Sequence, residues 1–173
     1  GTSFTIHLPV ILPEQRTEDV PELDKAEGDI DVKKERKILL VAEDNADLRR
    51  FVVSSFEGEY DVRQAEDGAA AFDLALEIIP DAVITDFIMP KMCGDELCRK
   101  LKKNERTSHI PIILLTAVTS KDTELEGLKA GADDYITKPF DINMLRQKLE
   151  NLIQMQENLR KRFKCDMILE PTN

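Results

Sequence analysis

Three apolar runs that end in charged residues constrain most strongly how this chain can fold. They cover residues 38–44, 82–86 and 135–139, and the charges at their ends are Glu43, Asp44, Asp86 and Lys138. A continuous apolar run, unlike an alternating one, is typical of a strand buried on both faces of a parallel sheet. Ligands bind at the carboxyl ends of the strands in such a sheet. We therefore expect three carboxylates and one lysine to converge there, a combination that suits a divalent metal and a phosphoryl group.

Strands alternate with helices from residue 37 onward. The expected strands are 38–43, 61–65, 82–86, 112–116 and 134–137, and the expected helices are 46–56, 68–79, 94–103, 121–130 and 142–163. Five strands, each followed by a helix, indicate parallel pairing with right-handed crossovers and helices on both faces. The prediction is an α/β fold: a flavodoxin-like, doubly wound, five-stranded parallel sheet of order 2-1-3-4-5, with an extended C-terminal helix. This order makes strands 38–43 and 82–86 neighbours, whereas the short, polar strand 61–65 lies near an edge.

Finer expectations follow from the pattern inside these helices. Helix 46–56 should pack one face on the sheet through Leu48, Phe51, Val52 and Phe56. Helix 68–79 carries its apolar side chains at Ala70, Ala71, Leu74, Leu76 and Ile78. Helix 121–130 should end at Gly131, in a left-handed cap.

Composition excludes several classes of partner. The net charge is −10, from 34 acidic and 24 basic residues, which argues against nonspecific binding of nucleic acid or of an anionic membrane. No apolar run approaches the roughly 20 residues of a membrane span, and no signal peptide is visible, so we expect a cytoplasmic protein. Cys93, Cys98 and Cys165 form no disulfide or zinc framework, and we interpret them as reduced, buried bystanders.

The carboxylates at the strand ends define the expected chemistry. Because Glu43, Asp44 and Asp86 would repel one another at close range, a cation should lie among them. Oxygen ligands without histidine or cysteine favour Mg²⁺ or Mn²⁺. A carboxylate beside a metal and the Lys138 ammonium can attack phosphorus, and Thr116 offers a hydroxyl to a phosphoryl oxygen.

Four motifs occur in order, each at the end of an expected strand. They are Glu43-Asp44, Asp86 within D-F-I-M-P-K-M-C-G, Thr116-Ala117 and Lys138-Pro139-Phe140. With these motifs, residues 37–154 resemble a receiver domain of bacterial two-component signalling. The resemblance implies that Asp86 is the phospho-acceptor, that Asp44 and Asp86 bind Mg²⁺ directly, that Glu43 acts through water, and that the Ile88 carbonyl completes the site.

The same resemblance implies a conformational switch and a partner. Thr116 and Tyr135 would form the switch pair, Lys138 would contact the phosphoryl group, and the Lys138-Pro139 bond would be cis. The phosphoryl donor would be the phosphohistidine domain of a sensor kinase. Ile88 and Val118 are apolar where water would attack, so we expect slow self-dephosphorylation.

The flanking segments suggest that the chain is a fragment of a hybrid histidine kinase. Residues 1–9 resemble the last strand of a kinase ATP-binding domain, and residues 10–36 read as an acidic linker. Residues 155–173 read as a helical linker toward an output domain, resembling the segment before arabinose-regulator-type DNA-binding domains. The C-terminal helix carries a heptad seam. Beyond about Leu152, this seam should pack on a partner helix, as in a homodimer. Its members are Leu145, Leu149, Leu152, Gln156, Leu159 and Phe163.

Two other classes of function remain open at this point. A haloacid-dehalogenase-like hydrolase also uses an aspartate nucleophile with Mg²⁺, but it needs a second aspartate where this chain has Ile88. A degenerate receiver could serve as a dimerisation module alone, although the complete set of site residues speaks against it. Taken singly, each site residue is more often an ordinary turn former, helix cap or solvated side chain.

Overall fold

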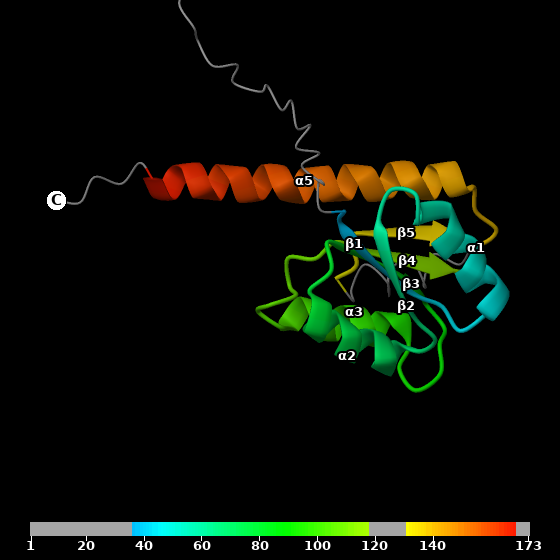
Figure 1. Ribbon diagram of the computed structural model, residues 1–173. Helices are drawn as coiled ribbons and strands as arrows, with labels where there is room; N and C mark the ends of the chain where they lie inside the picture. The colour runs from blue at the N-terminus through cyan, green and yellow to red at the C-terminus, as the bar shows by residue number, and fades with distance from the viewer. Residues whose placement is uncertain (1–35, 118–130, 169–173) are drawn as a thin grey trace, which may run out of the picture. The chain divides into compact units, whose positions relative to one another are not determined.

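The computed structural model describes residues 36–117 and 131–168, with side chains described up to residue 162 (Figure 1). The expected helix 121–130, strand 1–9, most of the linker 10–36, and the side chains of Val118, Phe163 and Cys165 lie outside these residues. The described strands and helices occur in the predicted order. In chain order they are β1 (Ile38–Ala42), α1 (Ala46–Phe56), β2 (Asp61–Ala65), α2 (Gly68–Ile78), β3 (Ala82–Asp86), α3 (Gly94–Lys103), β4 (Ile112–Thr116), β5 (Asp134–Thr137) and α5 (Ile142–Ile168).

The five strands form one parallel sheet in the order β2-β1-β3-β4-β5, which confirms the predicted topology. The register aligns Ala42 of β1 with Thr85 of β3, so the residues that follow both strands leave the sheet side by side. β2 lies at the edge, as its polar sequence predicted. The sheet thus brings the ends of β1 and β3 together at its carboxyl edge.

Two apolar layers cover the sheet, one on each face (Figure 1). On one face, α1 and α5 pack against side chains such as Leu39, Ile84 and Leu115. On the other face, α2 and α3 pack against Leu40, Val83 and their neighbours. Strands whose side chains are buried on both sides require apolar residues at successive positions, which is why β3 and β4 read as continuous apolar runs.

Two details of the sequence interpretation, the burial of Phe51 and that of Cys93, were wrong. Phe51 is 50% exposed, because α1 turns Val52, Val53 and Phe56 toward the sheet instead. The apolar residues predicted for α2 carry no such error: Ala71 is buried and Leu74 packs against the core. Cys93 is exposed rather than buried, whereas Cys98 is buried in the core.

The C-terminal helix α5 is five residues longer than predicted and continues past the ends of the strands (Figure 1). Leu145 and Leu149 are fully buried, and Ile153 is the last buried residue of α5 up to residue 162, close to the predicted end of core contact at Leu152. Along the predicted seam, Gln156 is half-buried and Leu159 is 37% exposed. No helix in the described part of the chain is long and apolar enough to span a membrane.

Two backbone expectations are confirmed. The Lys138-Pro139 peptide bond is cis. Gly131 has a φ of 88°, in the left-handed region where glycine is favoured.

Candidate functional site

The turn after β1 places two acidic residues in different environments. Asn45 caps α1, its side-chain oxygen accepting hydrogen bonds from the backbone N–H groups of Asp47 and Leu48, each at 3.0 Å. The chain therefore turns immediately after β1 and leaves Glu43 buried but Asp44 exposed. Arg49, one turn into α1, donates from Nη1 to the carbonyl oxygens of Glu43 at 2.5 Å and Asp44 at 3.3 Å. The guanidinium thus ties the acidic turn to the helix.

Asp86 is the last residue of β3, and its side chain lies at the carboxyl edge of the sheet. Its Oδ1 accepts a hydrogen bond from the backbone N–H of Phe87 at 2.7 Å. The Asp86 carbonyl is closely covered by the start of α3: a Cβ on Gly94 would lie 2.0 Å from that oxygen. Glycine at position 94 therefore allows α3 to begin directly against the end of β3.

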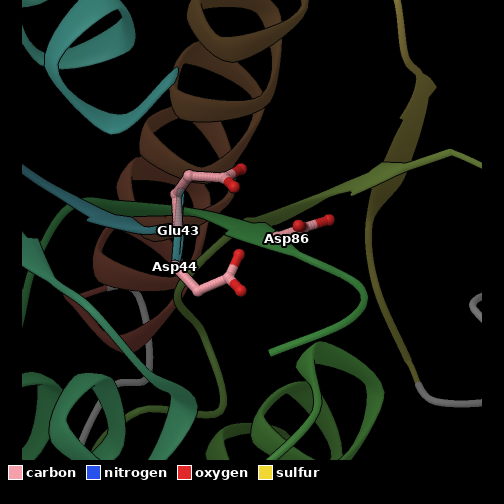
Figure 2. Close-up of side chains that lie close together, drawn as sticks. All are labelled: Glu43, Asp44 and Asp86. Atoms are coloured by element: carbon pink, nitrogen blue, oxygen red, sulfur yellow. The ribbon is translucent and has the colours of Figure 1, made fainter. Parts of the chain in front are cut away.

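The three predicted carboxylates lie together, each offering an oxygen within 4.8 Å of the others (Figure 2). Glu43 and Asp44 come from the end of β1, and Asp86 comes from the neighbouring strand β3. Carboxylates this close repel one another, so a cation among them is favoured. The donor set contains oxygen alone and mixes buried and exposed carboxylates, which fits a hard divalent cation that keeps part of its water shell.

Lys138 joins this cluster from the end of β5. Its Nζ lies 2.8 Å from Oε2 of Glu43 and 2.9 Å from Oδ2 of Asp86. Burial acts to lower the pKa of Lys138, but the hydrogen bonds to these two carboxylates outweigh it and the pKa is raised. Burial raises the pKa of Glu43, against the opposing hydrogen bond from Lys138. Lysine thus stays charged and offsets the negative charge at the site.

The other predicted site residues occupy positions around this cluster. Thr116 ends β4 and is buried, and it pairs in register with Thr137 of β5. Tyr135 lies on β5 and is half-buried. Ile88 is 64% exposed in the turn that follows β3, two residues after Asp86. Thr116 and Ile88 therefore lie at the carboxyl edge of the sheet, whereas Tyr135 lies two residues before the end of β5.

Two charged contacts near the site were missed by the sequence analysis. One is the Arg49 clamp on the acidic turn, for which the sequence offers no signal because the acceptors are backbone carbonyls. The other is an ion pair between Lys91 and Asp67, at 2.6 Å. Asp67 before Gly68 at the start of a helix is a typical N-cap signature, but its pairing with a lysine 24 residues away is a tertiary contact.

Residues 39–150 match the family of the response regulator receiver domain. The chain belongs to this family. A receiver domain accounts for the fold, the strand order and the grouping of acidic residues at the carboxyl edge of the sheet. The resemblance stated from the motifs is thereby confirmed at the level of the family.

Curated relatives include several large sensor kinases. The chain is 38% identical over 151 residues to histidine kinase P4 of Formosa agariphila, covering 87% of this chain and 11% of that protein. It is 38% identical over 118 residues to the sensor histidine kinase TmoS of Ectopseudomonas mendocina, covering 68% of this chain and 12% of that protein. The chain thus spans about a tenth of the length of these kinases.

Solved receiver domains have the same fold. The receiver domain of the Francisella response regulator 1452 is 34% identical, with a TM-score of 0.65, covering 69% of this chain and 98% of that one. The receiver domain of a sensor histidine kinase from Pseudomonas aeruginosa, solved with magnesium in its active-site cleft, is 28% identical with a TM-score of 0.65. It also covers 69% of this chain and 98% of that one.

Proposed function

We propose that this receiver domain accepts a phosphoryl group on Asp86 from a phosphohistidine and changes conformation in response. The observation that carries the proposal is the convergence of Asp86 with two further carboxylates and with Lys138, from three different strands. Carboxylates clustered at a buried strand end repel one another, so this arrangement contributes little to the free energy of unfolding. It suits a site where a metal and a phosphoryl group bind together.

The transfer is a displacement at phosphorus. A carboxylate oxygen of Asp86 attacks the phosphorus atom, an O–P bond forms, and the N–P bond of the phosphohistidine breaks with its electron pair returning to the ring nitrogen. Asp86 is reachable, since its side chain is 12% exposed and lies at the edge of the sheet. Its Oδ1 is fixed by the Phe87 N–H, while Oδ2 faces the Lys138 ammonium.

The metal ligands would be Asp44 and Asp86 directly, Glu43 through water, and the carbonyl of Ile88. Mg²⁺, or Mn²⁺ in its place, would supply positive charge to the phosphoryl oxygens when bound. The exposed Asp44 suits a direct ligand that meets a partly hydrated ion. Glu43 is held by Lys138 and by the backbone N–H of Asn45, at 3.3 Å, which suits an outer position.

Thr116, Tyr135 and Lys138 are proposed to carry the response. In phosphorylated protein, the Thr116 hydroxyl would move to a phosphoryl oxygen, the Tyr135 ring would turn inward, and Lys138 would pair with the new negative charge. Thr116 and Tyr135 lie on adjacent strands, so a shift of the end of β4 would reach β5. Thr116 and Lys138 thus act at the phosphoryl group, and the response reaches the surface through β5.

The chain is proposed to be part of a hybrid histidine kinase. Residues 1–9 would end the kinase catalytic domain, residues 10–36 would link it to a receiver at 37–154, and residues 155–173 would lead to a DNA-binding output domain. The phosphohistidine domain of the same parent chain would be the donor. The large kinases among the relatives support this assignment. The fragment itself would be no turnover enzyme, and it would reside in the cytoplasm, with the parent protein held at the inner membrane.

A homodimer through α5 is proposed for the part of the helix beyond Ile153. Met155 is 60% exposed and Leu159 is 37% exposed, on a helix face that contacts no core. A shallow cavity of about 380 Å³ lies between the side chains of this face. A second copy of the helix would cover these apolar groups.

Replacement of the acceptor tests the proposed function. We expect Asp86→Asn to abolish phosphate incorporation from a small acyl phosphate with Mg²⁺, because an amide oxygen is a poor nucleophile. Intact-mass spectrometry measures the added phosphoryl group, and Asp73→Asn, on the exposed face of α2, serves as the matched control. Unchanged incorporation in Asp86→Asn would overturn the proposal.

The two other classes of function have separate readouts. Catalytic release of phosphate from small esters would favour the hydrolase, although Ile88 stands where that mechanism needs an aspartate. Binding of beryllofluoride without any change in oligomeric state or in the environment of Tyr135 would favour a dimerisation module without a switch.

A further inference from the structure

A buried carboxylate and a lysine join the start of α2 to the turn after β3. Lys91 Nζ lies 2.6 Å from Oδ2 of Asp67, whose side chain is 3% exposed. The other oxygen of Asp67 accepts a hydrogen bond from the Ala70 N–H, at 2.8 Å, and so caps α2. Both carboxylate oxygens are therefore used, one by the helix and one by the turn.

The turn that contains Lys91 has an unusual backbone. The Met92 N–H donates to the Pro90 carbonyl at 2.7 Å, and Lys91 between them has a φ of 63°. This is the rare form of the γ-turn, which strains a residue with a side chain. Lys91 and Ile79 are the two non-glycine residues with positive φ in the described ranges. A strained turn persists when the surrounding contacts determine it.

The turn is tightly packed at both of its ends. The Gly94 N–H donates to the Phe87 carbonyl at 2.9 Å, which closes the turn where it meets α3. On the other side, a Cβ on Gly68 would lie 2.1 Å from the Met92 carbonyl oxygen. The start of α2 therefore supports the turn through backbone contact at Gly68 and through the ion pair at Asp67.

Residues 87–93 form this turn, and Ile88 lies within it. We propose that the Asp67–Lys91 ion pair holds the turn where the Ile88 carbonyl can reach the magnesium ion, so that both residues position the metal site without touching it. The inference rests on the proposed function, which assigns that carbonyl as a ligand. Mg²⁺ requires near-ideal octahedral geometry with ligands at about 2.0–2.1 Å, so a small displacement of one ligand weakens binding.

An alternative is that the pair contributes to stability alone. Lys91 is 66% exposed although Asp67 is buried, so the pair contributes less to the free energy of unfolding than a fully buried pair would. A purely structural pair would therefore leave magnesium affinity unchanged when it is removed from a protein that still folds. The two roles separate in a binding measurement on the folded chain.

Removal of the lysine charge is the main test. We expect Lys91→Met to raise the dissociation constant for Mg²⁺ about tenfold, the lower end of the range for residues that orient metal ligands. Isothermal titration calorimetry with MgCl₂ on the whole chain measures it, and urea unfolding without Mg²⁺ should change little. Lys91→Arg, which keeps the charge, should restore affinity to near the original value.

A second variant approaches the pair from the carboxylate. Asp67→Asn keeps an oxygen to cap α2 but removes the charge that Lys91 pairs with, and it should weaken Mg²⁺ binding to a similar extent. The double variant should be no weaker than either single one, because one interaction is lost in all three. Lys103→Met, at an exposed position on α3, is the matched control and should bind Mg²⁺ normally.

Unchanged Mg²⁺ affinity in folded Lys91→Met and Asp67→Asn would overturn the inference. If Asp86 still accepted phosphate in those proteins, the positioning role alone would fall. If Asp86→Asn were phosphorylated as efficiently as the unaltered chain, the proposed function would fall instead, whatever the affinity of the Lys91 variants.

Discussion

The carboxyl edge of the sheet and the helix α5 hold charge in opposite ways. At the edge, Glu43, Asp86 and Lys138 are largely removed from water and rely on one another for neutralisation. Along α5, the buried side chains are apolar, and the ion pairs of Lys148 with Asp134 and of Glu157 with Lys37 lie at the rim, where water reaches them. The edge therefore responds to added charge such as a metal or a phosphoryl group. The contact of α5 depends on apolar area instead.

Lys138, at the end of β5, connects the charged edge of the sheet with the strand that contacts α5. It reaches Glu43, 95 residues earlier in the chain, across the two strands β4 and β3 that lie between β5 and β1. A change in charge at Asp86 therefore alters a contact on β5, the strand whose Asp134 pairs with Lys148 of α5. The charged cluster and the apolar contact of α5 are thus stabilised in different ways, and β5 is the strand that contacts both.

The largest effect is expected in the apolar region. Leu149→Ala removes a fully buried side chain from the sheet-facing side of α5 and should lower the free energy of unfolding by about 3 kcal/mol. Urea unfolding followed by circular dichroism measures this loss. Mg²⁺ affinity of the folded protein should stay the same. A parallel loss of Mg²⁺ binding would contradict the separation of the two regions.

An intermediate effect is expected at the charged edge. Lys138→Met leaves two carboxylates without the ammonium that neutralises them. Without Mg²⁺, it should lower the free energy of unfolding by about 2 kcal/mol. This loss is smaller than for a fully buried ion pair, because water still reaches the lysine. Mg²⁺ should then raise the melting temperature of the variant more than that of the unaltered chain. Lys148→Met, whose pair with Asp134 is more exposed, is the control and should gain no extra stabilisation from Mg²⁺.

The smallest effect is expected at the exposed end of α5. Leu159→Ala should change the free energy of unfolding by less than about 0.5 kcal/mol, because the side chain lies beyond the last buried residue, Ile153. Sedimentation measured on the same variant tests the proposed dimer, whose association should weaken. A loss of stability close to that of Leu149→Ala would mean that this end of the helix belongs to the core.

The sequence predicted the fold well because its signals are local and repeat. Buried parallel strands require continuous apolar runs, as in β3 and β4. The alternation of strands and helices indicates a parallel sheet, and the order 2-1-3-4-5 is one that doubly wound sheets commonly adopt. The grouping of Glu43, Asp44 and Asp86 followed from that order, since strand ends meet at one edge. The burial of Phe51 was predicted wrongly because α1 has apolar residues at the successive positions 51, 52 and 53. The sequence alone does not specify which of them faces the sheet, and packing against the sheet decides it.

What the sequence determined by itself is the set of strand-end charges and the edge at which they gather. The tertiary structure decided how each charge is held: Glu43 buried, Asp44 exposed, and Lys138 placed between Glu43 and Asp86. It also decided the contacts of Arg49 with backbone carbonyls and of Lys91 with Asp67. Residue order specifies where a strand ends. Burial and charge pairing depend on side chains that meet only after the layers have packed.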